Sequence, residues 1–380
     1  MKKLKIVSVL LTAAMICSLF SGCMAAIAEV SFDASGKGSI KMSTGVSERM
    51  MSEEELQEAK QDPETVMFQY NGTNYYGTVE TVSFNDIEAE SAGDGSEKYF
   101  RNTDGSWTIW INFSEDMTAE AGASEMDTAE MTQEMMDLLT KDMVALYIMH
   151  APDSLIQIGG GKTGVTVNGK DLKFDMMAMG LITDHPAYGI YTFTTAKKLP
   201  TFSDVAANQW YTPAVTTLAL GGMVDGVGNG RFAPAGKLTA AEFCQMVARA
   251  AGAEVGADES GYWAAKAIKA CLANGIVANR GEVNAKNYGV VITREEAIAG
   301  MTLLMTGGLT DEDKTANAEL SAQIPDYSKI SAQYRDLILA AYANGITSGV
   351  DASGTFRPMG ELSRAEMCQL FYNVGIATVG

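Results

Sequence analysis

Three segments in the second half of the chain repeat one helical pattern of apolar positions that ends on a glycine. The apolar residues stand at i, i+3 and i+4, which marks one face of a helix. The segments are 215–222, 268–275 and 338–345. A glycine directly after such a pattern predicts a helix C-cap in the left-handed region. Four residues further on stand Gly226, Asn279 and Gly349, which we expect to be a second position of positive φ.

A second helix is predicted at a nearly constant distance from each glycine. Thr239, Thr293 and Ser363 lie 17 or 18 residues after the three glycines, and each precedes a glutamate by three residues. The Ser/Thr-x-x-Glu spacing indicates a capping box, in which the hydroxyl and the carboxylate each accept a backbone N–H. Each repeat is therefore predicted to be a helix, a glycine-bearing loop and a helix.

The first repeat carries a combination of residues that resembles the S-layer homology (SLH) module. The combination is Phe202-Ser203-Asp204-Val205, Trp210-Tyr211, Gly222, Gly226, Phe232-x-Pro234 and Thr239-x-Ala241-Glu242. The resemblance implies three tandem SLH repeats, at 199–252, 256–306 and 324–377, in an all-α pseudo-threefold helix bundle. Its grooves are implied to bind secondary cell-wall polysaccharide or peptidoglycan.

The arginine of the Thr-Arg-Ala-Glu signature is the best candidate for contact with such a polymer. Capping explains the hydroxyl and the glutamate, packing explains the alanine, and the arginine is left without a structural task. A guanidinium beside a helix N-terminus suits a carboxylate or phosphate. We therefore predict Arg294 and Arg364 as ligand contacts, the alternative being solvated surface arginines. The first repeat has Ala240 there, so one or two working grooves are expected.

Other positions enter the candidate site through the same family resemblance. Asp204 and Asp326 match its early aspartate, whereas the second repeat offers only Asp258 at a shifted place. Trp210 and Trp263 match each other, and either sugar stacking or anchoring of the first helix in the core would explain them. Gly226 and Gly349 complete the predicted polymer-binding set. Residues 306–323 are expected to be a polar linker between the second and third repeats.

Residues 29–198 are predicted to form a separate α+β domain. The expected elements are a hairpin around residues 35–38, an acidic helix capped by Ser52, strands at 75–84, 107–113, 155–158, 165–167 and 190–195, and a helix at 127–146. The alternation in the strands at 75–84 and 107–113 predicts that they are half-buried. The domain is weakly similar to LppM-like bacterial lipoproteins, on a lipobox-like start, the hairpin, Tyr75-Tyr76-Gly77 and Pro152…Gly159-Gly160. That resemblance implies no catalytic residue.

Charge is divided unevenly between the two halves. The formal net charge is −19, and residues 29–195 alone contribute −19 whereas residues 196–380 contribute −3. Nucleic acid is excluded as a partner, because phosphate binding needs a basic surface. The division also supports two separate units.

The first 28 residues are predicted to be an export signal, with three lysines before an apolar stretch. Two processing sites remain open: a lipobox that would place a lipid on Cys23, and cleavage after Ala28. The remaining cysteines, Cys244, Cys271 and Cys368, are expected to be small buried residues. No metal or other cofactor is expected, because the chain has only two histidines and no CxxC pair.

Two sequence features imitate catalytic motifs. Gly159-Gly160-Gly161-Lys162-Thr163 resembles the end of a phosphate loop, but Ile156 stands where the first glycine belongs, so a hairpin turn is predicted. His150 and His185 have no nucleophile or metal ligands near them in the sequence. We therefore expect a surface protein, bound to the cell wall and not an enzyme. The alternatives are an enzyme with its active site in residues 29–198, and an outer-membrane protein that binds peptidoglycan.

Overall fold

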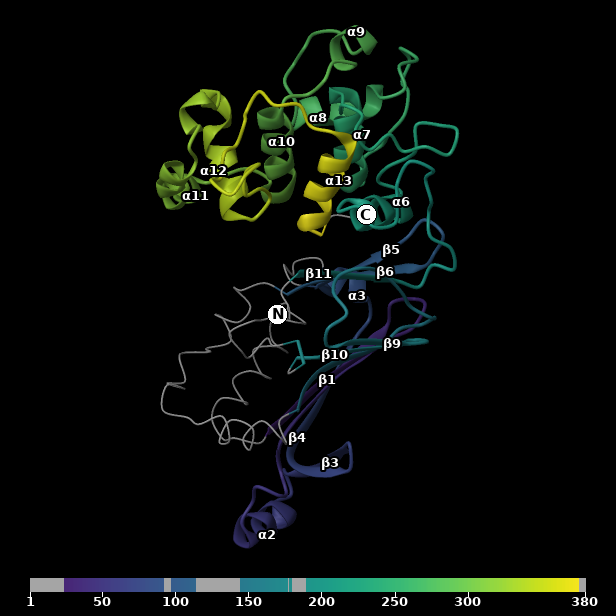
Figure 1. Ribbon diagram of the computed structural model, residues 1–380, viewed down its shortest axis with the longest axis vertical. Coiled ribbons are helices and arrows are strands. Elements are labelled where there is room, and N and C mark those ends of the chain that lie inside the picture. Colours follow the sequence, from purple (N-terminus) through teal and green to yellow (C-terminus); the bar gives the residue numbers. More distant parts are fainter. Residues whose placement is uncertain (1–23, 92–96, 114–143, 177, 180–188, 376–380) are drawn as a thin grey trace. The chain divides into compact units, whose positions relative to one another are not determined.

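The chain folds into two compact units in the computed structural model, which describes residues 24–91, 97–113, 144–176, 178–179 and 189–375 (Figure 1). Unit 1 consists of Met1–Arg101 and Gly105–Lys197, and unit 2 of Asn102–Asp104 and Lys198–Gly380. Unit 1 combines β-sheets with short helices, and unit 2 is helical. The predicted division into an α+β half and a helical half is therefore confirmed.

The larger sheet of unit 1 has seven strands in the order β3-β4-β2-β1-β7-β10-β9. They are β1 (Met24–Phe32), β2 (Gly38–Ser47), β3 (Val66–Tyr70), β4 (Thr73–Phe84), β7 (Val144–His150), β9 (Val165–Asn168) and β10 (Asp171–Asp175). β1 and β2 pair antiparallel from Met24 opposite Val46 to Phe32 opposite Gly38, which confirms the predicted hairpin. β1 also pairs with β7 in parallel, so the chain crosses over between them.

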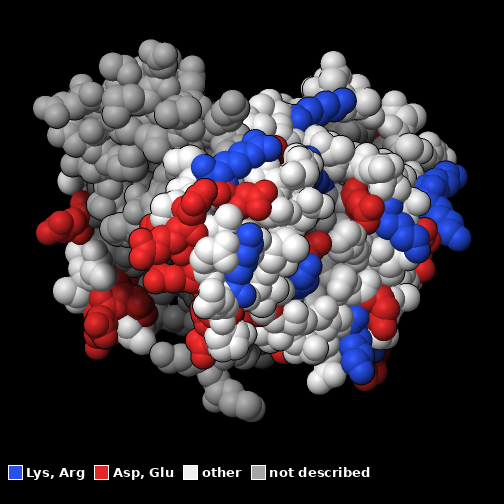
Figure 2. Space-filling model, turned by 90° about the horizontal axis from the view of Figure 1, so that it is seen from below, with Lys and Arg blue, Asp and Glu red and all other residues white. Residues whose placement is uncertain are grey.

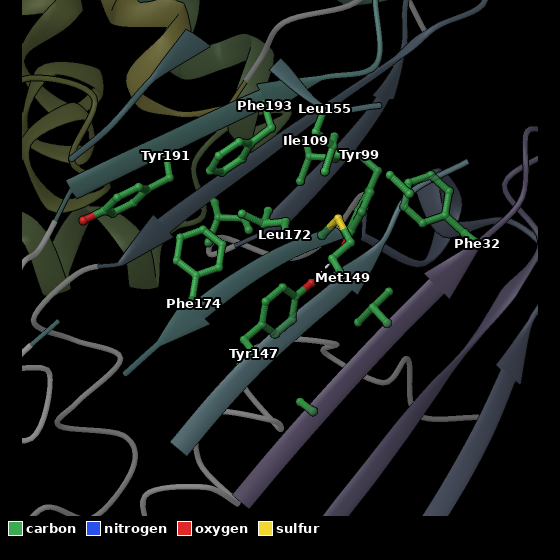
Figure 3. Packing of buried hydrophobic residues seen from close by; sticks show 14 of the residues in the cluster. Phe32, Tyr99, Ile109, Tyr147, Met149, Leu155, Leu172, Phe174, Tyr191 and Phe193 are labelled. Atoms are coloured by element: carbon green, nitrogen blue, oxygen red, sulfur yellow. Dashed lines mark hydrogen bonds between the residues drawn. The ribbon is translucent and has the colours of Figure 1, made fainter. Parts of the chain in front are cut away.

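The smaller sheet has the order β5-β6-β11-β8. Its strands are β5 (Glu97–Arg101), β6 (Trp107–Phe113), β8 (Ile156–Gly159) and β11 (Gly189–Thr194). Six of the seven side chains of β6 are buried, so the expected half-buried alternation is wrong for this strand. The core lies between the sheets: Phe174 of β10 faces Tyr191 and Phe193 of β11, at ring-centroid distances of 5.4 and 5.8 Å (Figure 3).

Two short helices complete the described part of unit 1. α2 (Glu53–Gln61) begins at the predicted capping box of Ser52 and Glu55, and α3 (Ile87–Ser91) follows β4. α2 buries none of its side chains, and its first turn carries Glu53, Glu54 and Glu55. Figure 2 shows acidic side chains gathered in a cluster on the face seen from below, in keeping with the charge of this half of the sequence.

Two predictions for unit 1 are corrected. Most of the helix expected at 127–146 lies outside the described residues, but its last three positions belong to strand β7. The glycine-rich segment after β8 is not a hairpin turn, because β8 pairs with β11 while β9 pairs with β10 in the other sheet. That segment instead connects the two sheets, and strand β9 follows it where a phosphate loop requires a helix.

Unit 2 contains the predicted helix pairs. Its helices are α6 (Thr212–Leu220), α7 (Ala240–Ala250), α8 (Ala265–Ala273), α9 (Ala285–Tyr288), α10 (Arg294–Thr306), α11 (Asp311–Asn317), α12 (Arg335–Ala343) and α13 (Arg364–Asn373), with 3-10 turns η2 (Ala318–Gln323), η3 (Tyr327–Lys329) and η4 (Ala332–Tyr334). The glycines after α6, α8 and α12 are left-handed as predicted, with φ of 75°, 68° and 66° at Gly222, Gly275 and Gly345.

The second predicted left-handed position holds only in the third repeat. Gly349 has φ 92°, whereas Gly226 and Asn279 are not among the residues of positive φ. Glycine at 226 has another cause, since a Cβ there would lie 2.7 Å from the carbonyl oxygen of Arg231. The polar segment expected at 306–323 lies between α10 and α12. Most of it is helical: Thr310 and Asp313 form a capping box that begins α11, and neither α11 nor η2 buries a side chain.

In unit 2, the second helix of each predicted repeat packs against the first helix of the next. α7 packs against α8, α10 packs against α12, and α13 packs against α6 of the first repeat, which closes the order. The segments that lead into α7, α10 and α13 also meet pairwise in short β-bridges, Lys237 with Ser363, Thr239 with Val291, and Thr293 with Glu361. The last described helix, α13, therefore packs against the first predicted repeat. In the described part of the chain, the helices all fall short of the length and apolarity that crossing a membrane requires.

Candidate functional site

The starts of α7, α10 and α13 frame the candidate site. Thr239 with Glu242 and Ser363 with Glu366 form complete capping boxes. At α10 the Thr293 hydroxyl accepts the Glu296 N–H, but the Glu296 carboxylate is used elsewhere. Its Oε1 accepts the Ala278 N–H at 2.8 Å, and its Oε2 pairs with Arg280. The predicted capping boxes are thus confirmed in the first and third repeats. In the second repeat only the hydrogen bond to the threonine hydroxyl is present.

The two early aspartates hold the loops in front of the second helices. Asp204 accepts the N–H groups of Phe232 and Ala233 at 2.8 and 2.9 Å, and these hydrogen bonds hold the pKa of its carboxyl below the ordinary value. Asp326 accepts the N–H groups of Phe356 and Arg357 at 2.8 and 2.9 Å. Ala233 and Arg357 both have positive φ, 56° and 57°, which an L-residue adopts at a cost. The carboxylates hold that strained backbone in place.

Arg364 connects the third repeat to the first. Its Nε donates to the Phe232 carbonyl at 3.0 Å, Nη2 to the Asp225 carbonyl at 2.7 Å, and Nη1 to Glu242 Oε1 at 2.7 Å. Its guanidinium also lies 4.7 Å from the centre of the Phe232 ring. The expectation that this arginine has no structural task is therefore wrong. The sequence motif is local, whereas the partners of Arg364 lie more than 120 residues earlier in the chain.

Arg280 occupies the corresponding place in the second repeat, which sequence reasoning missed. The first repeat carries Ala240 where the other repeats have the signature arginine, so no arginine reaches the second repeat from there. Arg280 instead comes from the second repeat's own loop, pairs with Glu296 and lies 5.7 Å from the centre of the Tyr288 ring. Burial lowers the pKa of Arg280, but the hydrogen bond to Glu296 and the negative charge of that carboxylate together outweigh burial, so the pKa is raised. The only sequence signal was Tyr288 at the aromatic position.

Arg294 connects the second repeat to the third, but without a carboxylate. It is 7% exposed, lies 5.7 Å from the centre of the Phe356 ring, and donates from Nη2 to Thr347 Oγ1 at 3.2 Å. Its Nε has no hydrogen-bond partner among the described residues. Burial lowers the pKa of this guanidinium, and the negative charge of Glu366 offsets part of that effect. The alternative of a solvated surface arginine is thus wrong here.

The two tryptophans of the candidate site are exposed. Trp210 is 60% exposed and Trp263 is 48% exposed, so anchoring of a helix in the core does not explain their side chains. An exposed aromatic ring offers a flat apolar face on which a sugar ring packs. The third repeat has Gln333 and Tyr334 at this point, and burial raises the pKa of the Tyr334 hydroxyl.

A pocket of about 590 Å³ lies beside Trp263 and Tyr262. We call it the Trp263 pocket. Its charged lining residues are Asp225, Glu242, Arg249 and Arg364. Arg249 pairs with Asp225 at 2.7 Å and Arg364 pairs with Glu242 at 2.7 Å, so the charges of the pocket lining cancel. Cys368 closes the pocket from the core side, and burial raises the pKa of its thiol to about 12.

A second pocket, of about 490 Å³, lies beside Arg294. We call it the Arg294 pocket. It is lined by Arg294, Tyr342, the turn from Gly345 to Gly349, and Asn373 among others. Burial raises the pKa of Tyr342 to about 12, so this hydroxyl remains neutral. The predicted site residues therefore fall into separate places: Arg364 and Trp263 share one pocket, and Arg294 and Gly349 share another. Asp204 and Asp326 act behind them on the loops.

The three cysteines of unit 2 are buried and unpaired, as expected. The Cys271 thiol donates to the Cys244 carbonyl at 3.7 Å, and its proximity together with burial raises the pKa of the Cys244 thiol. Among the described residues, no group of three or more histidine, cysteine, aspartate and glutamate side chains is placed to hold a metal ion.

Comparison with known proteins identifies the helical unit. The S-layer homology (SLH) domain matches residues 201–244 and 323–368, which fall in the first and third predicted repeats. Unit 2 therefore carries SLH domains, and the resemblance predicted from the sequence is confirmed.

Two curated relatives and one solved structure are similar to parts of the chain. The exoglucanase XynX of Acetivibrio thermocellus is 29% identical over 187 residues, which is 47% of this chain and 16% of that protein. The amylopullulanase of Thermoanaerobacterium thermosulfurigenes is 30% identical over 183 residues, 46% of this chain and 9% of that protein. The chain thus spans less than a fifth of either relative. The folded domain of Mycobacterium tuberculosis LppM gives a TM-score of 0.23 at 6% identity, over 46% of this chain and 90% of that one.

Proposed function

We propose that this protein is exported and held non-covalently to cell-wall polysaccharide or peptidoglycan by its SLH repeats. The observation that carries the proposal is the SLH match at residues 201–244 and 323–368, together with an open pocket beside the exposed ring of Trp263 in the same unit. Unit 1 would then be presented at the cell surface or within the wall.

We further propose that unit 2 is a bundle of three SLH repeats. The pairs α6–α7, α8–α10 and α12–α13 have the same helix–loop–helix form, including the pair at 256–306. The closed order of helix contacts and the three bridges between the loop ends support a pseudo-threefold arrangement. On this interpretation the signature arginines Arg294 and Arg364 each contact the next repeat. The first repeat has Ala240 at this position, and Arg280 replaces the arginine that is missing there.

The polymer contacts in this proposal are Trp210, Trp263, Arg294 and Arg364. The tryptophans would stack on sugar rings, and the arginines would hydrogen-bond to polar or anionic groups. Asp204, Asp326, Gly226 and Gly349 would contribute by shaping the loops that carry the pockets. Their hydrogen bonds and close approaches within the protein support that indirect role.

For the N-terminus we propose that processing occurs at Cys23, with lipid attached to that residue. β1 begins at Met24, and Ala25 and Ala26 are buried opposite Gly45 and Thr44 of β2. Cleavage after Ala28 would remove five of the nine residues of this strand from the middle of the larger sheet. The mass of the mature N-terminal peptide distinguishes the two sites, and a mature chain that begins at Glu29 would refute lipidation at Cys23.

Sedimentation with purified cell wall tests the tethering proposal. The full chain should co-sediment with wall, and Trp210→Ala with Trp263→Ala should weaken retention about 10- to 100-fold, since loss of an aromatic stacking contact of this kind costs about 1–3 kcal/mol. Met359→Ala is the matched control, because Met359 is 68% exposed and lies outside both pockets. Failure of the unaltered chain to sediment would refute the proposal.

A wall-tethered enzyme with its active site in residues 29–198 is the second candidate. The observation that favours it is that both curated relatives are named as enzymes, although the chain covers only a small part of each. A zymogram of the full chain on purified wall decides between them: a cleared zone would establish an activity, and its absence at saturating protein would count against one.

A further inference from the structure

Strand β4 is paired along most of its length on one side and along less than half of it on the other. β2 pairs with β4 from Tyr75 to Phe84, whereas β3 pairs with it only from Thr73 to Gly77 (Figure 1). In the described part of the chain, the outer side of β4 beyond Gly77 has no neighbouring strand. We call residues 78–84 on that side the open edge.

The exposure of the β4 side chains changes where β3 ends. Thr73 and Tyr75 are buried beside β3, whereas Glu80 and the three residues after it are exposed. Val82 is 43% exposed, although it stands opposite Ile40, which belongs to the core of unit 1. The core therefore ends at an exposed apolar side chain, which an added strand would bury.

The backbone of the open edge presents its hydrogen-bonding groups at every second residue. Asn71 and Gly72 form the two-residue turn between β3 and β4, and both have positive φ, 46° and 78°. The residues that flank such a turn form a hydrogen-bonded pair, and the pattern alternates from there. Counted in twos from the turn, the residues whose N–H and C=O groups point to the open edge are Val79, Thr81 and Ser83. Each offers one donor and one acceptor to an added strand.

The charge around the open edge is of one sign. Residues 61–91 include six acidic and no basic residues. The acidic residues are Asp62 and Glu64 before β3, Glu80 in the open edge, and Asp86, Glu88 and Glu90 after β4. Lys41 of β2 stands opposite Thr81, but it pairs with Glu29 at 2.7 Å. A strand that carries lysine or arginine is therefore attracted to this edge, and an acidic strand is repelled.

We propose that the open edge accepts an extended basic segment of another protein as an added strand. A second copy of this chain fits less well, because its residues 29–195 also contribute −19 of charge. Main-chain hydrogen bonds hold the segment, an apolar side chain beside Val82 extends the core, and a basic side chain pairs with Glu80. The site lies in unit 1, so it goes beyond tethering by the SLH domains and does not depend on it.

The probe is the acetylated and amidated heptapeptide Lys-Val-Lys-Val-Lys-Val-Lys, added to the full chain, and the same peptide with glutamate for lysine is its control. Hydrogen exchange is followed residue by residue by NMR. At a peptide concentration of about ten times Kd, the amides of Val79, Thr81 and Ser83 should exchange about 10-fold more slowly. The amides of Glu80 and Val82 already face β2, so their exchange should change little. Added NaCl should weaken binding of the basic peptide.

A proline in the open edge separates main-chain pairing from other binding. Thr81→Pro removes an N–H that points away from β2, so it should abolish the protection while unit 1 stays folded. Thr81→Val is the matched control, because it keeps the N–H and a β-branched side chain, and it should bind as the unaltered chain does. Glu80→Gln removes a charge and should weaken binding about 2- to 5-fold, as for an exposed ion pair. Emission of the buried Trp107 and Trp110 checks that unit 1 is folded in each variant.

Three results would overturn the proposal: no protection by the basic peptide, equal protection by the acidic peptide, or protection without alternation along β4. Protection of the same amides in the free chain at rising protein concentration would mean that a second copy occupies the edge, and the proposal would again be wrong. If Thr81→Pro unfolds unit 1, the alternation of the protected amides and the weaker binding of Glu80→Gln decide.

Discussion

At the scale of single residues, the aspartates of the SLH signature stabilise strained loops. Asp326 accepts two backbone N–H groups, one of them from Arg357 at φ 57°. Asp326 is buried, and so is Phe356. If the carboxylate is lost, water cannot replace it as the acceptor for the Phe356 N–H. The Phe-x-Pro ending of the loop therefore depends on a residue 30 positions earlier in the sequence.

Asp326→Ala is predicted to lower the free energy of unfolding of unit 2 by about 2–3 kcal/mol, because it leaves the buried Phe356 N–H without an acceptor and releases a strained turn. Urea denaturation of the full chain, followed by the helical circular dichroism signal, measures the change. Asp311→Ala is the matched control, since that carboxylate is fully exposed. Equal midpoints for the two variants would show that Asp326 does not hold the loop.

The capping residues were predictable and the partners of the arginines were not. A capping box is closed within four residues, so the spacing of Ser363 and Glu366 is sufficient to identify it. Arg364 finds its three partners in the first repeat, at a distance along the chain that no local pattern reports. The substitution of Arg280 for the missing arginine is hidden for another reason, because Arg280 lies outside the signature, in the loop of the same repeat, 16 residues before its partner Glu296.

At the scale of elements, the sequence predicted helices that end on glycine and failed where tertiary pairing decides. α6, α8 and α12 end at left-handed glycines as expected. Residues 144–146 continue the periodic pattern of the expected helix, yet they belong to β7, where Ala145 and Leu146 pair with Ala26 and Ile27 of β1. A strand in the middle of a sheet is apolar on both faces, so its pattern does not distinguish it from a buried helix.

Closure of the helix order predicts a long-range effect of a C-terminal truncation. Ending the chain after residue 360 removes α13, its packing on α6, and the Leu238 N–H to Leu362 carbonyl bond of 2.9 Å. Amides of α6 should then exchange with solvent much faster, although α6 lies over 100 residues away in sequence. In an open stack of repeats, each unit contacts only its neighbours, and the first would be unaffected.

Hydrogen exchange with mass spectrometry of peptides from α6 measures this. The control is Gln369→Ala, which alters α13 only at a side chain that bonds within the helix, to Asn373 at 2.7 Å. Unchanged exchange in α6 after the truncation would mean that the first repeat is stable without the third, and the closed arrangement would contribute nothing to it.

At the scale of the whole molecule, the two units differ in charge and in the placement of tryptophan. The chain has four tryptophans. Trp107 and Trp110 are buried in unit 1, each 1% exposed, whereas Trp210 and Trp263 are exposed in unit 2. Tryptophan emission therefore shifts mainly when unit 1 unfolds. The helical circular dichroism signal reports mainly unit 2, which holds the longer helices.

Salt is predicted to stabilise unit 1 selectively. Residues 29–195 contribute −19 of charge and residues 196–380 only −3, so repulsion among like charges opposes folding chiefly in the first. Raising NaCl from about 0.02 to about 0.3 M shortens the screening length from roughly 20 to roughly 6 Å. The unfolding midpoint seen by tryptophan emission should rise, while the midpoint seen by helical circular dichroism should stay nearly constant. Sodium sulfate, which stabilises proteins through preferential exclusion, should raise both midpoints and serves as the contrast. A single transition with both signals moving together would show that the two units unfold as one. Repulsion within the acidic half would then lower the stability of the whole chain.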